Sequence, residues 1–240
     1  MLDNIRIILC QPSHPGNIGA CARAMKNMGL NRLTLIRPEI FPHASATERA
    51  SGADDVLANA KVVETLEEGI ANCHWVFGTS ARSREFPWPQ MTSREAAEKV
   101  VSFAQEHQEI GILFGTERSG LTNAELQRCD FHLTIPTHPS YSSLNLSQAV
   151  QVVAYEIYQH WLTKKPIDSA QPVETHFEKA TKEEIAGLLK HFEETAIKIG
   201  FMDPDHPKKL LPRLKRLFSK AQLEKEEINI LRGFLKLTQR

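Results

Sequence analysis

The sequence predicts an α/β domain over residues 1–163, a linker at 164–180 and a small all-helical extension at 181–240. Two features predict the domain: short apolar runs rich in β-branched residues, and segments between them in which apolar residues recur at helical spacing. Strands that alternate with helices are typical of a sheet covered by helices. This alternation stops near residue 163, and only helical patterns follow it.

Five apolar runs are expected to form the strands. They show little alternation of polar and apolar residues, as expected for parallel strands that are buried on both faces. The runs are Ile5–Cys10, Arg32–Arg37, His74–Thr79, Ile110–Gly115 and Phe131–Pro136.

The segments between these runs predict helices at Asn17–Met28, Thr65–Ala71 and Ser93–Glu106. The strongest helical pattern in the chain covers Asn145–Leu162. Its apolar residues recur every three or four positions, which places them on one face of a helix. They are Leu146, Ala149, Val150, Val153, Ala154, Ile157 and Trp161.

The linker has two prolines and few large apolar residues. Thr181 and Glu184 then form a capping box that predicts the start of a helix, and Gly200 is expected to end it. Two further helices are expected near residues 208–218 and 222–237. A unit of about 60 residues buries little core, so we expect it to dock on another surface.

Composition places the chain among cytosolic globular proteins. Apolar residues make up 41% and charged residues 24%, close to the globular average. No apolar run approaches the roughly 20 residues that span a bilayer, and the first residues lack the basic and long apolar regions of a signal peptide. We therefore expect no membrane contact. The four cysteines form no CxxC motif, so we expect neither a disulfide framework nor a metal site.

The charge distribution is more informative than the total. The chain has 29 basic and 29 acidic residues, so the overall basic bias of many nucleic-acid-binding proteins is missing. Residues 208–220, however, hold six basic residues and no acidic one: Lys208, Lys209, Arg213, Lys215, Arg216 and Lys220. This basic segment could bind phosphates, or it could be the solvated face of a helix whose leucines are in the core.

Several common catalytic motifs are missing from the sequence. It has no Walker loop, GxGxxG, HExxH or GxSxG pattern, which argues against the usual nucleotide-binding, zinc-protease and hydrolase sites. A nicotinamide-dependent oxidoreductase fits the α/β pattern, but the glycine fingerprint and the ribose-binding acid after the first helix are missing.

Three unusual segments follow or end predicted strands: Gly16–Arg23, Leu113–Leu121 and Ile135–Ser147. Taken singly, each has a structural explanation, as an exposed helix arginine, as turn glycines and as helix N-caps. Asn17 is expected to cap a helix or to orient another side chain. Ligands bind at the carboxyl ends of strands in α/β sheets, so the three segments together mark a candidate site.

The order and spacing of these segments resemble the SPOUT methyltransferases, in the TrmH-like branch that methylates ribose 2′-hydroxyls in RNA. That branch has an Asn-x-Gly motif with an arginine six residues after the asparagine, then Gly-x-Glu followed by Gly-Leu, then Ile-Pro followed by Ser-Leu-Asn-x-Ser. The matching residues are Asn17, Gly19 and Arg23; Gly115, Glu117, Gly120 and Leu121; and Ile135, Pro136, Ser143, Leu144, Asn145 and Ser147. The resemblance covers residues 3–163. Residues 79–89, residues 139–145 and the helical extension are similar to bacterial members that methylate nucleotide 32 in the tRNA anticodon loop.

The resemblance implies a sheet with a C-terminal deep trefoil knot, a topology that is otherwise nearly absent from proteins. It also implies S-adenosylmethionine as methyl donor, tRNA as substrate and a homodimer that completes the active site. The implied donor contacts are Thr79, Ser80, Ala81, Gly115, Ile135, Ser142, Ser143 and Leu144. The implied catalytic group is Arg23, Asn17, Ser143, Asn145 and Glu117, and Arg82 and Arg84 would join the basic segment 208–220 in binding RNA.

Arg23 is the residue on which the chemistry is expected to depend. An arginine stays protonated in proteins, so it is a poor general base. Our hypothesis is that Arg23 binds the phosphate beside the target ribose through two hydrogen bonds, with Asn17 orienting its guanidinium. Glu117 is expected either to orient other side chains or to cap a helix. Two alternatives stay open: the same chemistry on another tRNA nucleotide or on ribosomal RNA, and a non-catalytic RNA-binding protein with the same fold.

Overall fold

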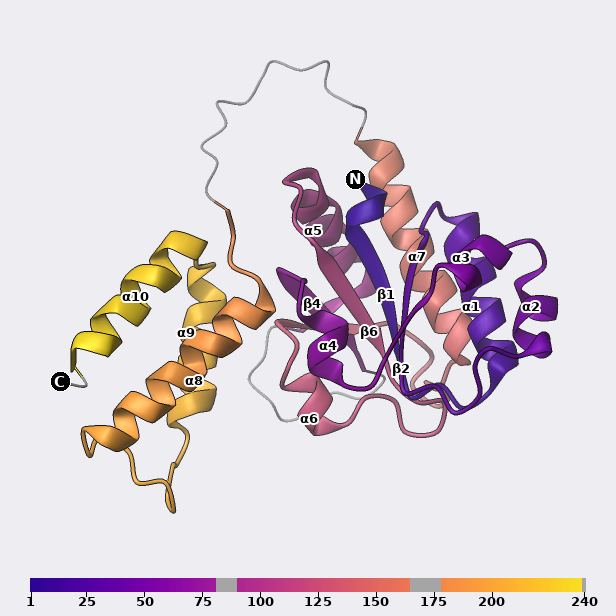
Figure 1. The fold of residues 1–240 in the computed structure, drawn as a ribbon. Coiled ribbons are helices and arrows are strands. Elements are labelled where there is room, and N and C mark those ends of the chain that lie inside the picture. Colours follow the sequence, from indigo (N-terminus) through magenta and orange to yellow (C-terminus); the bar gives the residue numbers. More distant parts are fainter. Residues whose placement is uncertain (81–89, 165–177, 239–240) are drawn as a thin grey trace. The chain divides into compact units, whose positions relative to one another are not determined.

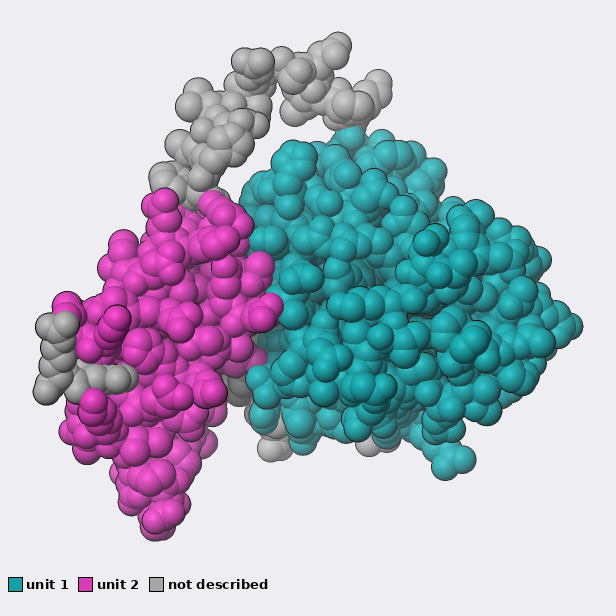
Figure 2. All heavy atoms as spheres, viewed as in Figure 1, with its two compact units in different colours: residues 1–170 teal, residues 171–240 magenta. Residues whose placement is uncertain are grey.

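The structure is a computed structural model that describes residues 1–80, 90–164 and 178–238. The chain divides into two compact units, residues 1–170 and residues 171–240, which are coloured teal and magenta in Figure 2. The first unit carries all the strands of the sheet, and the second carries three helices (Figure 1).

The first unit is built on a seven-stranded sheet in which every strand pair is parallel. In space the strands follow the order β3-β2-β1-β6-β4-β7-β5. Their bounds are β1 Ile5–Cys10, β2 Arg32–Ile36, β3 Lys61–Val63, β4 Trp75–Thr79, β5 Gln90–Thr92, β6 Ile110–Phe114 and β7 Phe131–Thr134. All five predicted strands are confirmed, and the three-residue strands β3 and β5 at the two edges are additional.

Helices cover both faces of this sheet. A 3-10 turn at Leu2–Asn4 leads into β1. The helices are α1 Pro15–Asn27, α2 Ala44–Ala50, α3 Asp54–Ala58, α4 Leu66–Ile70, α5 Ser93–Gln105, α6 Asn123–Leu126 and α7 Leu146–Thr163. The four predicted helices correspond to α1, α4, α5 and α7, whereas α2, α3 and α6 were not predicted. α7 lies against α1 and α5, and Figure 1 shows α1 and α7 side by side.

The alternation of side chains along β1 separates two cores. Ile7 and Leu9 belong to the larger core, which includes residues of α1, α2, α3, α5 and α7. Ile8 and Cys10 point the other way, into a smaller core with residues of α4 and α6. Burial on both faces is the reason that β1 reads as an uninterrupted apolar run.

The second unit contains α8 Lys182–Lys198, α9 Leu210–Ala221 and α10 Lys225–Thr238. The predicted capping box is confirmed: the Thr181 hydroxyl accepts a hydrogen bond from the Glu184 amide, and the Glu184 carboxylate accepts one from the Thr181 amide. The helices enclose a small apolar core of Ala180, Leu188, Phe218, Ile228 and Leu235. Among the described residues of both units, no helix combines the length and apolar character needed to cross a bilayer.

Candidate functional site

Strands β1, β6, β4 and β7 are neighbours in the sheet, so their carboxyl ends lie at one edge. Three predicted donor contacts stand at these ends: Thr79 closes β4, Gly115 follows β6 and Ile135 follows β7. The Thr79 hydroxyl donates to the Leu113 carbonyl at 2.9 Å, and the Ser80 amide donates to the Leu133 carbonyl at 2.9 Å. These bonds tie the end of β4 to both neighbouring strands.

Helix α1 begins at this edge with a proline and a histidine cap. The His14 ring accepts a hydrogen bond from the Gly16 amide at 3.0 Å, and Pro15 occupies the first helical position, where no amide hydrogen is needed. Asn17 therefore lies inside the first turn and is not the cap. The capping role is therefore wrong. The predicted orientation of Arg23 by Asn17 is not seen in this structure, because the Asn17 side chain bonds to Glu117 and Asn145 and no hydrogen bond joins it to the Arg23 guanidinium.

Glu117 joins the β6 loop to the start of α1. Its carboxylate accepts hydrogen bonds from the Ser13 amide at 3.1 Å, the Ser13 hydroxyl at 3.0 Å and the His14 amide at 3.3 Å. It also accepts one from the Asn17 side-chain amide at 2.9 Å. Glu117 thus orients Asn17 and, in addition, satisfies backbone amides that precede α1.

Asn145 extends this network to the third segment. Its side-chain amide donates to the Asn17 side-chain oxygen at 3.2 Å, while its own oxygen caps α7 by accepting from the Ser147 amide at 2.9 Å. The structure therefore connects Glu117, Asn17 and Asn145, which are up to 128 positions apart in the sequence, in one chain of hydrogen bonds.

The electrostatics of this network favour an ionised Glu117. Partial burial pushes the pKa of its carboxyl up, but the hydrogen bonds from Asn17 and Ser13 outweigh that effect, so the pKa lies below its ordinary value of 4.5. Glu117 is therefore a carboxylate at neutral pH. The pKa of the nearby Cys21 thiol is strongly raised, first by burial and then by the charge of Glu117, so Cys21 stays a neutral core residue.

Two motif glycines allow close backbone approaches. A Cβ atom at Gly19 would lie 1.9 Å from the Ala46 carbonyl oxygen, because α1 packs against the backbone of α2 there. A Cβ atom at Gly115 would lie 2.0 Å from the Gly120 carbonyl carbon, so the loop that carries Glu117 closes on itself at this point. Gly120 has a positive φ of 67°, which favours glycine.

Arg23 is exposed and lies on a groove of about 350 Å³ between α1 and α7. Within the described part of the chain, its guanidinium forms no hydrogen bond or ion pair. Its neighbours in the groove are Ala20, Ala24, Asn27, Ser147, Gln148, Gln151 and Val152.

The remaining predicted residues fall into three groups. Ser142 and Ser143 are exposed and Leu144 is half-buried in the loop before α7. In the second unit, Lys208, Lys209, Arg213, Arg216 and Lys220 are exposed, whereas Lys215 is partly buried. Ala81, Arg82 and Arg84 lie outside the described residues. Among the residues that are described, no cluster of three or more His, Cys, Asp or Glu side chains could hold a metal ion.

Ser13 and His14 are the contributors to this site that the sequence analysis missed. Ser13 binds Glu117 mainly through a backbone amide and a hydroxyl on the loop after β1, and no spacing rule predicts such a pair. The available signal was the Ser-His-Pro sequence, because proline favours the first position of a helix and so points to His14 as the cap.

Comparisons with known proteins agree with the resemblance seen in the sequence. Residues 4–155 match the model of the SpoU rRNA methylase family, and residues 183–240 match the model of the TrmJ C-terminal domain. The chain is 49% identical to the tRNA (cytidine/uridine/adenosine-2'-O-)-methyltransferase TrmJ of Pseudomonas aeruginosa, over 100% of this chain and 95% of that protein. It is 47% identical to TrmJ of Klebsiella pneumoniae, over 98% and 96% of the two chains.

A solved structure extends the comparison to the fold. The crystal structure of TrmJ from Z. mobilis ZM4 aligns with a TM-score of 0.82 and 35% identity, over 98% of this chain and 99% of that one. The predicted fold class, an α/β sheet of the SPOUT type, is confirmed. This chain belongs to the SpoU methylase family and carries a C-terminal domain of the TrmJ type.

Proposed function

We propose that this protein is an S-adenosylmethionine-dependent tRNA 2'-O-methyltransferase that acts on the ribose of cytidine or uridine 32 in the anticodon loop. The observation that carries the proposal is the hydrogen-bonded chain Glu117–Asn17–Asn145 beside the exposed Arg23. The similar TrmJ proteins are named as tRNA 2'-O-methyltransferases. A role in tRNA modification also supports a cytoplasmic location.

The carboxyl edge of the sheet fits the methyl donor. The segments after β6 and β7 supply main-chain groups around Gly115, Ile135 and Leu144 that suit adenine recognition. The hydroxyls of Ser142 and Ser143 are exposed and bond to nothing in the described part of the chain, so they remain available to a ligand. When it is bound, the donor supplies a methyl group that its positive sulfur has already activated.

The protein's own contribution is alignment and charge. The reaction would form a bond between the methyl carbon and the ribose 2'-oxygen as the bond from carbon to sulfur breaks, with S-adenosylhomocysteine as the leaving product and the hydroxyl proton passing to solvent. Positioning of the reacting atoms contributes up to about 7–11 kcal/mol. Arg23 would bind the phosphate next to the target ribose through two parallel hydrogen bonds. Its positive charge would also favour the deprotonated 2'-oxygen.

Asn17 and Asn145 would hold the ribose end of the site. Asn17 is itself fixed on both sides, by Glu117 and by Asn145. An ionised Glu117 accepts hydrogen bonds only, so it forces Asn17 to turn its amide toward β6 and its oxygen toward α7. Ser143, in the loop that precedes α7, would contact the donor or the edge of the ribose.

A homodimer and a knotted chain belong to the same proposal. The groove along α1 and α7 leaves Arg23 on an open surface, and a second copy packed there would complete the cavity. The strand order also has β6 between β1 and β4, so the chain returns to the centre of the sheet before β7 and α7 follow. That return supports the deep trefoil knot which the resemblance implies.

The reaction and its target can be tested together. The purified protein is incubated with radiolabelled methyl donor and, in separate reactions, with total tRNA and with ribosomal RNA. We expect it to label the 2'-oxygen of nucleotide 32 in tRNA. Digestion and mapping of the label check this. A label at another tRNA nucleotide would contradict the target, and no label in tRNA together with label in ribosomal RNA would contradict the substrate. No label in either RNA would favour the non-catalytic alternative.

We also propose that the basic segment 208–220 binds the tRNA backbone. Arg213 and Arg216 are exposed on α9, so the double variant Arg213→Gln/Arg216→Gln removes two charges without opening the core. Binding measured at several salt concentrations should weaken, and the slope of log K against log salt should fall by about 2. The matched control is Lys190→Gln/Lys236→Gln, two exposed lysines on α8 and α10. Equal slopes in both double variants would show that the segment is only a solvated face.

A further inference from the structure

A polar cavity lies at the amino ends of the strands, opposite the carboxyl ends where the candidate active site lies. It has a volume of about 420 Å³ and is formed where β1 and β2 begin, beside α3 and β3. The candidate active site lies beyond Cys10, where β1 ends, whereas Arg6 is the second residue of β1, so about 13 Å of strand separates them. The lining residues are Arg6, Asn31, Arg32, Leu33, Thr34, Asp55, Val56, Asn59 and Lys61.

The sheet register places the basic residues of this cavity together. Arg6 is paired with Arg32 across β1 and β2, and Thr34 is paired with Lys61 across β2 and β3. Paired residues of neighbouring strands point to the same face, so both guanidiniums lie on the face where Ile8 and Cys10 form the smaller core. The smaller core does not extend to the amino ends of these strands. On the same face, the polar residues Arg6, Arg32 and Lys61 stand there instead.

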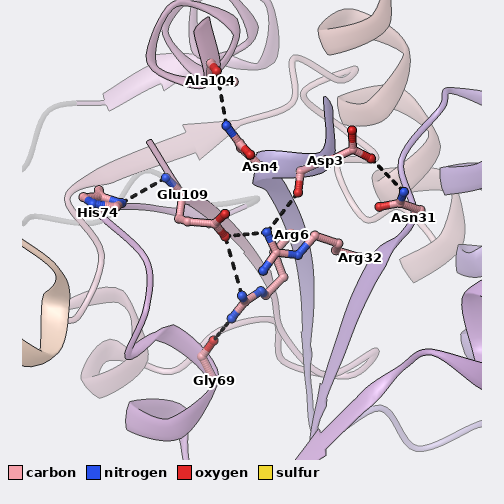
Figure 3. Close-up of polar contacts among 9 residues, drawn as sticks. All are labelled: Asp3, Asn4, Arg6, Asn31, Arg32, Gly69, His74, Ala104 and Glu109. Atoms are coloured by element: carbon pink, nitrogen blue, oxygen red, sulfur yellow. Dashed lines mark hydrogen bonds and ion pairs between the residues drawn. The ribbon is translucent and has the colours of Figure 1, made fainter. Parts of the chain in front are cut away.

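The two guanidiniums that line this cavity share the carboxylate of Glu109, which is not itself part of the lining (Figure 3). Glu109 lies 3.6 Å from the Arg6 guanidinium and 2.5 Å from that of Arg32. Arg6 also donates to the Gly69 carbonyl at 3.3 Å, and Arg32 donates to the Asp3 carbonyl at 2.9 Å. Only 7% of the Arg6 side chain is exposed. Because one carboxylate pairs with both guanidiniums, the group of Arg6, Arg32 and Glu109 keeps a net positive charge. Buried charges are costly unless they are paired.

The other acidic groups near the cavity compensate its positive charge only in part. Asp55 is in the lining, but its carboxylate already accepts from Lys26 at 2.7 Å. The carboxylate of Asp3 accepts from the neutral Asn31 side chain at 2.9 Å and keeps its negative charge, but Asp3 is not part of the lining. Lys61 has no ion-pair partner among the residues that the structure describes, which leaves the lining with a positive excess.

We propose that this cavity binds the phosphoryl group of a small molecule, up to the size of a mononucleotide. Arg6, Arg32 and Lys61 would supply charge-assisted hydrogen bonds, and Asn31, Asn59 and Thr34 would supply neutral ones. The volume lies in the range of small-molecule sites. The lining, as far as the structure describes it, holds no aromatic side chain for an unstacked base, so the phosphate and not the base is the recognised group.

The test uses the full-length protein and titrates inorganic phosphate, and separately adenosine monophosphate, by calorimetry in chloride buffer. We expect saturable binding of at least one of the two, weakened about tenfold by Lys61→Gln. Tighter binding of the nucleotide than of inorganic phosphate would identify a nucleotide as the preferred class. Lys61 is an exposed residue of β3, so its replacement leaves both cores intact, and Lys190→Gln is the matched control with an equal charge change.

The same variants separate this proposal from the proposed methyl transfer. Lys61→Gln should leave the rate of tRNA methylation and the affinity for tRNA unchanged, because the cavity lies at the amino ends of the strands and the candidate active site lies at their carboxyl ends. Phosphate binding that is equal in Lys61→Gln and in Lys190→Gln would overturn the proposal, as would a lack of saturable binding for both probes. A fall in tRNA affinity in Lys61→Gln alone would assign the cavity to the RNA backbone and would also overturn it.

Discussion

Replacing Arg23 with lysine is expected to lower the rate of tRNA methylation by about 100-fold while tRNA still binds. Lysine keeps the positive charge, but it offers a single point charge where arginine offers a planar pair of donors. The phosphate would then be held without a fixed orientation, and a displacement of about 1 Å at the reacting atoms costs on the order of 100-fold in rate. Arg23 is exposed beside the groove of α1 and α7, so the substitution creates no cavity in the core.

The measurement is the single-turnover rate at saturating donor and tRNA, together with the affinity for tRNA. Arg128→Lys is the matched control, because Arg128 is half exposed and pairs with Glu67 away from the groove. We expect the control to keep the full rate. A full rate in Arg23→Lys would contradict two-point binding of the phosphate and would leave charge alone as the contribution of Arg23.

The five longer strands could be predicted because each is a continuous apolar run that can be recognised without knowing its neighbours in the sheet. β1 has the predicted bounds Ile5–Cys10, and its six residues are buried on both faces. The strands β3 and β5 have three residues each, which is too short to form a recognisable apolar run. Helices α2, α3 and α6 have seven, five and four residues, which is between about one and two turns. So few residues show little helical spacing, and contacts with the rest of the fold stabilise these helices.

The candidate site could be predicted as a set of residues but not as a network. Spacing identified Asn17, Glu117 and Asn145, yet nothing local indicates that Glu117 binds Asn17 across 100 positions, or that Asn17 then binds Asn145. The fold decides these partners by bringing the ends of β1 and β6 together. Ser13 could not be predicted, because its backbone amide would serve Glu117 whatever its side chain. The cavity at the amino edge depends in the same way on the pairing of Arg6 with Arg32.

Replacing Gly115 with alanine is expected to destabilise the first unit by about 3 kcal/mol and to abolish methylation. The added Cβ would lie 2.0 Å from the Gly120 carbonyl carbon and 2.1 Å from the Leu121 amide nitrogen. Both are backbone atoms that cannot turn aside as a flexible side chain can, so the loop itself has to move. Overpacking of this kind typically costs about 1–3 kcal/mol, and a clash with backbone belongs at the upper end.

Activity and stability should fall together in this variant, because Glu117 stands on the loop that Gly115 closes. Movement of that loop would withdraw the carboxylate from Ser13 and Asn17, and Asn17 would then lose its fixed orientation toward Asn145. Urea unfolding followed by tryptophan fluorescence measures the stability change, because all three tryptophans of the chain fall within residues 1–170. Gly233→Ala is the control: a Cβ atom there meets nothing within 4 Å, and alanine favours the interior of α10. Full activity in Gly115→Ala would mean that the loop tolerates a second position for Glu117, and the Glu117–Asn17 bond would then not be what orients the site.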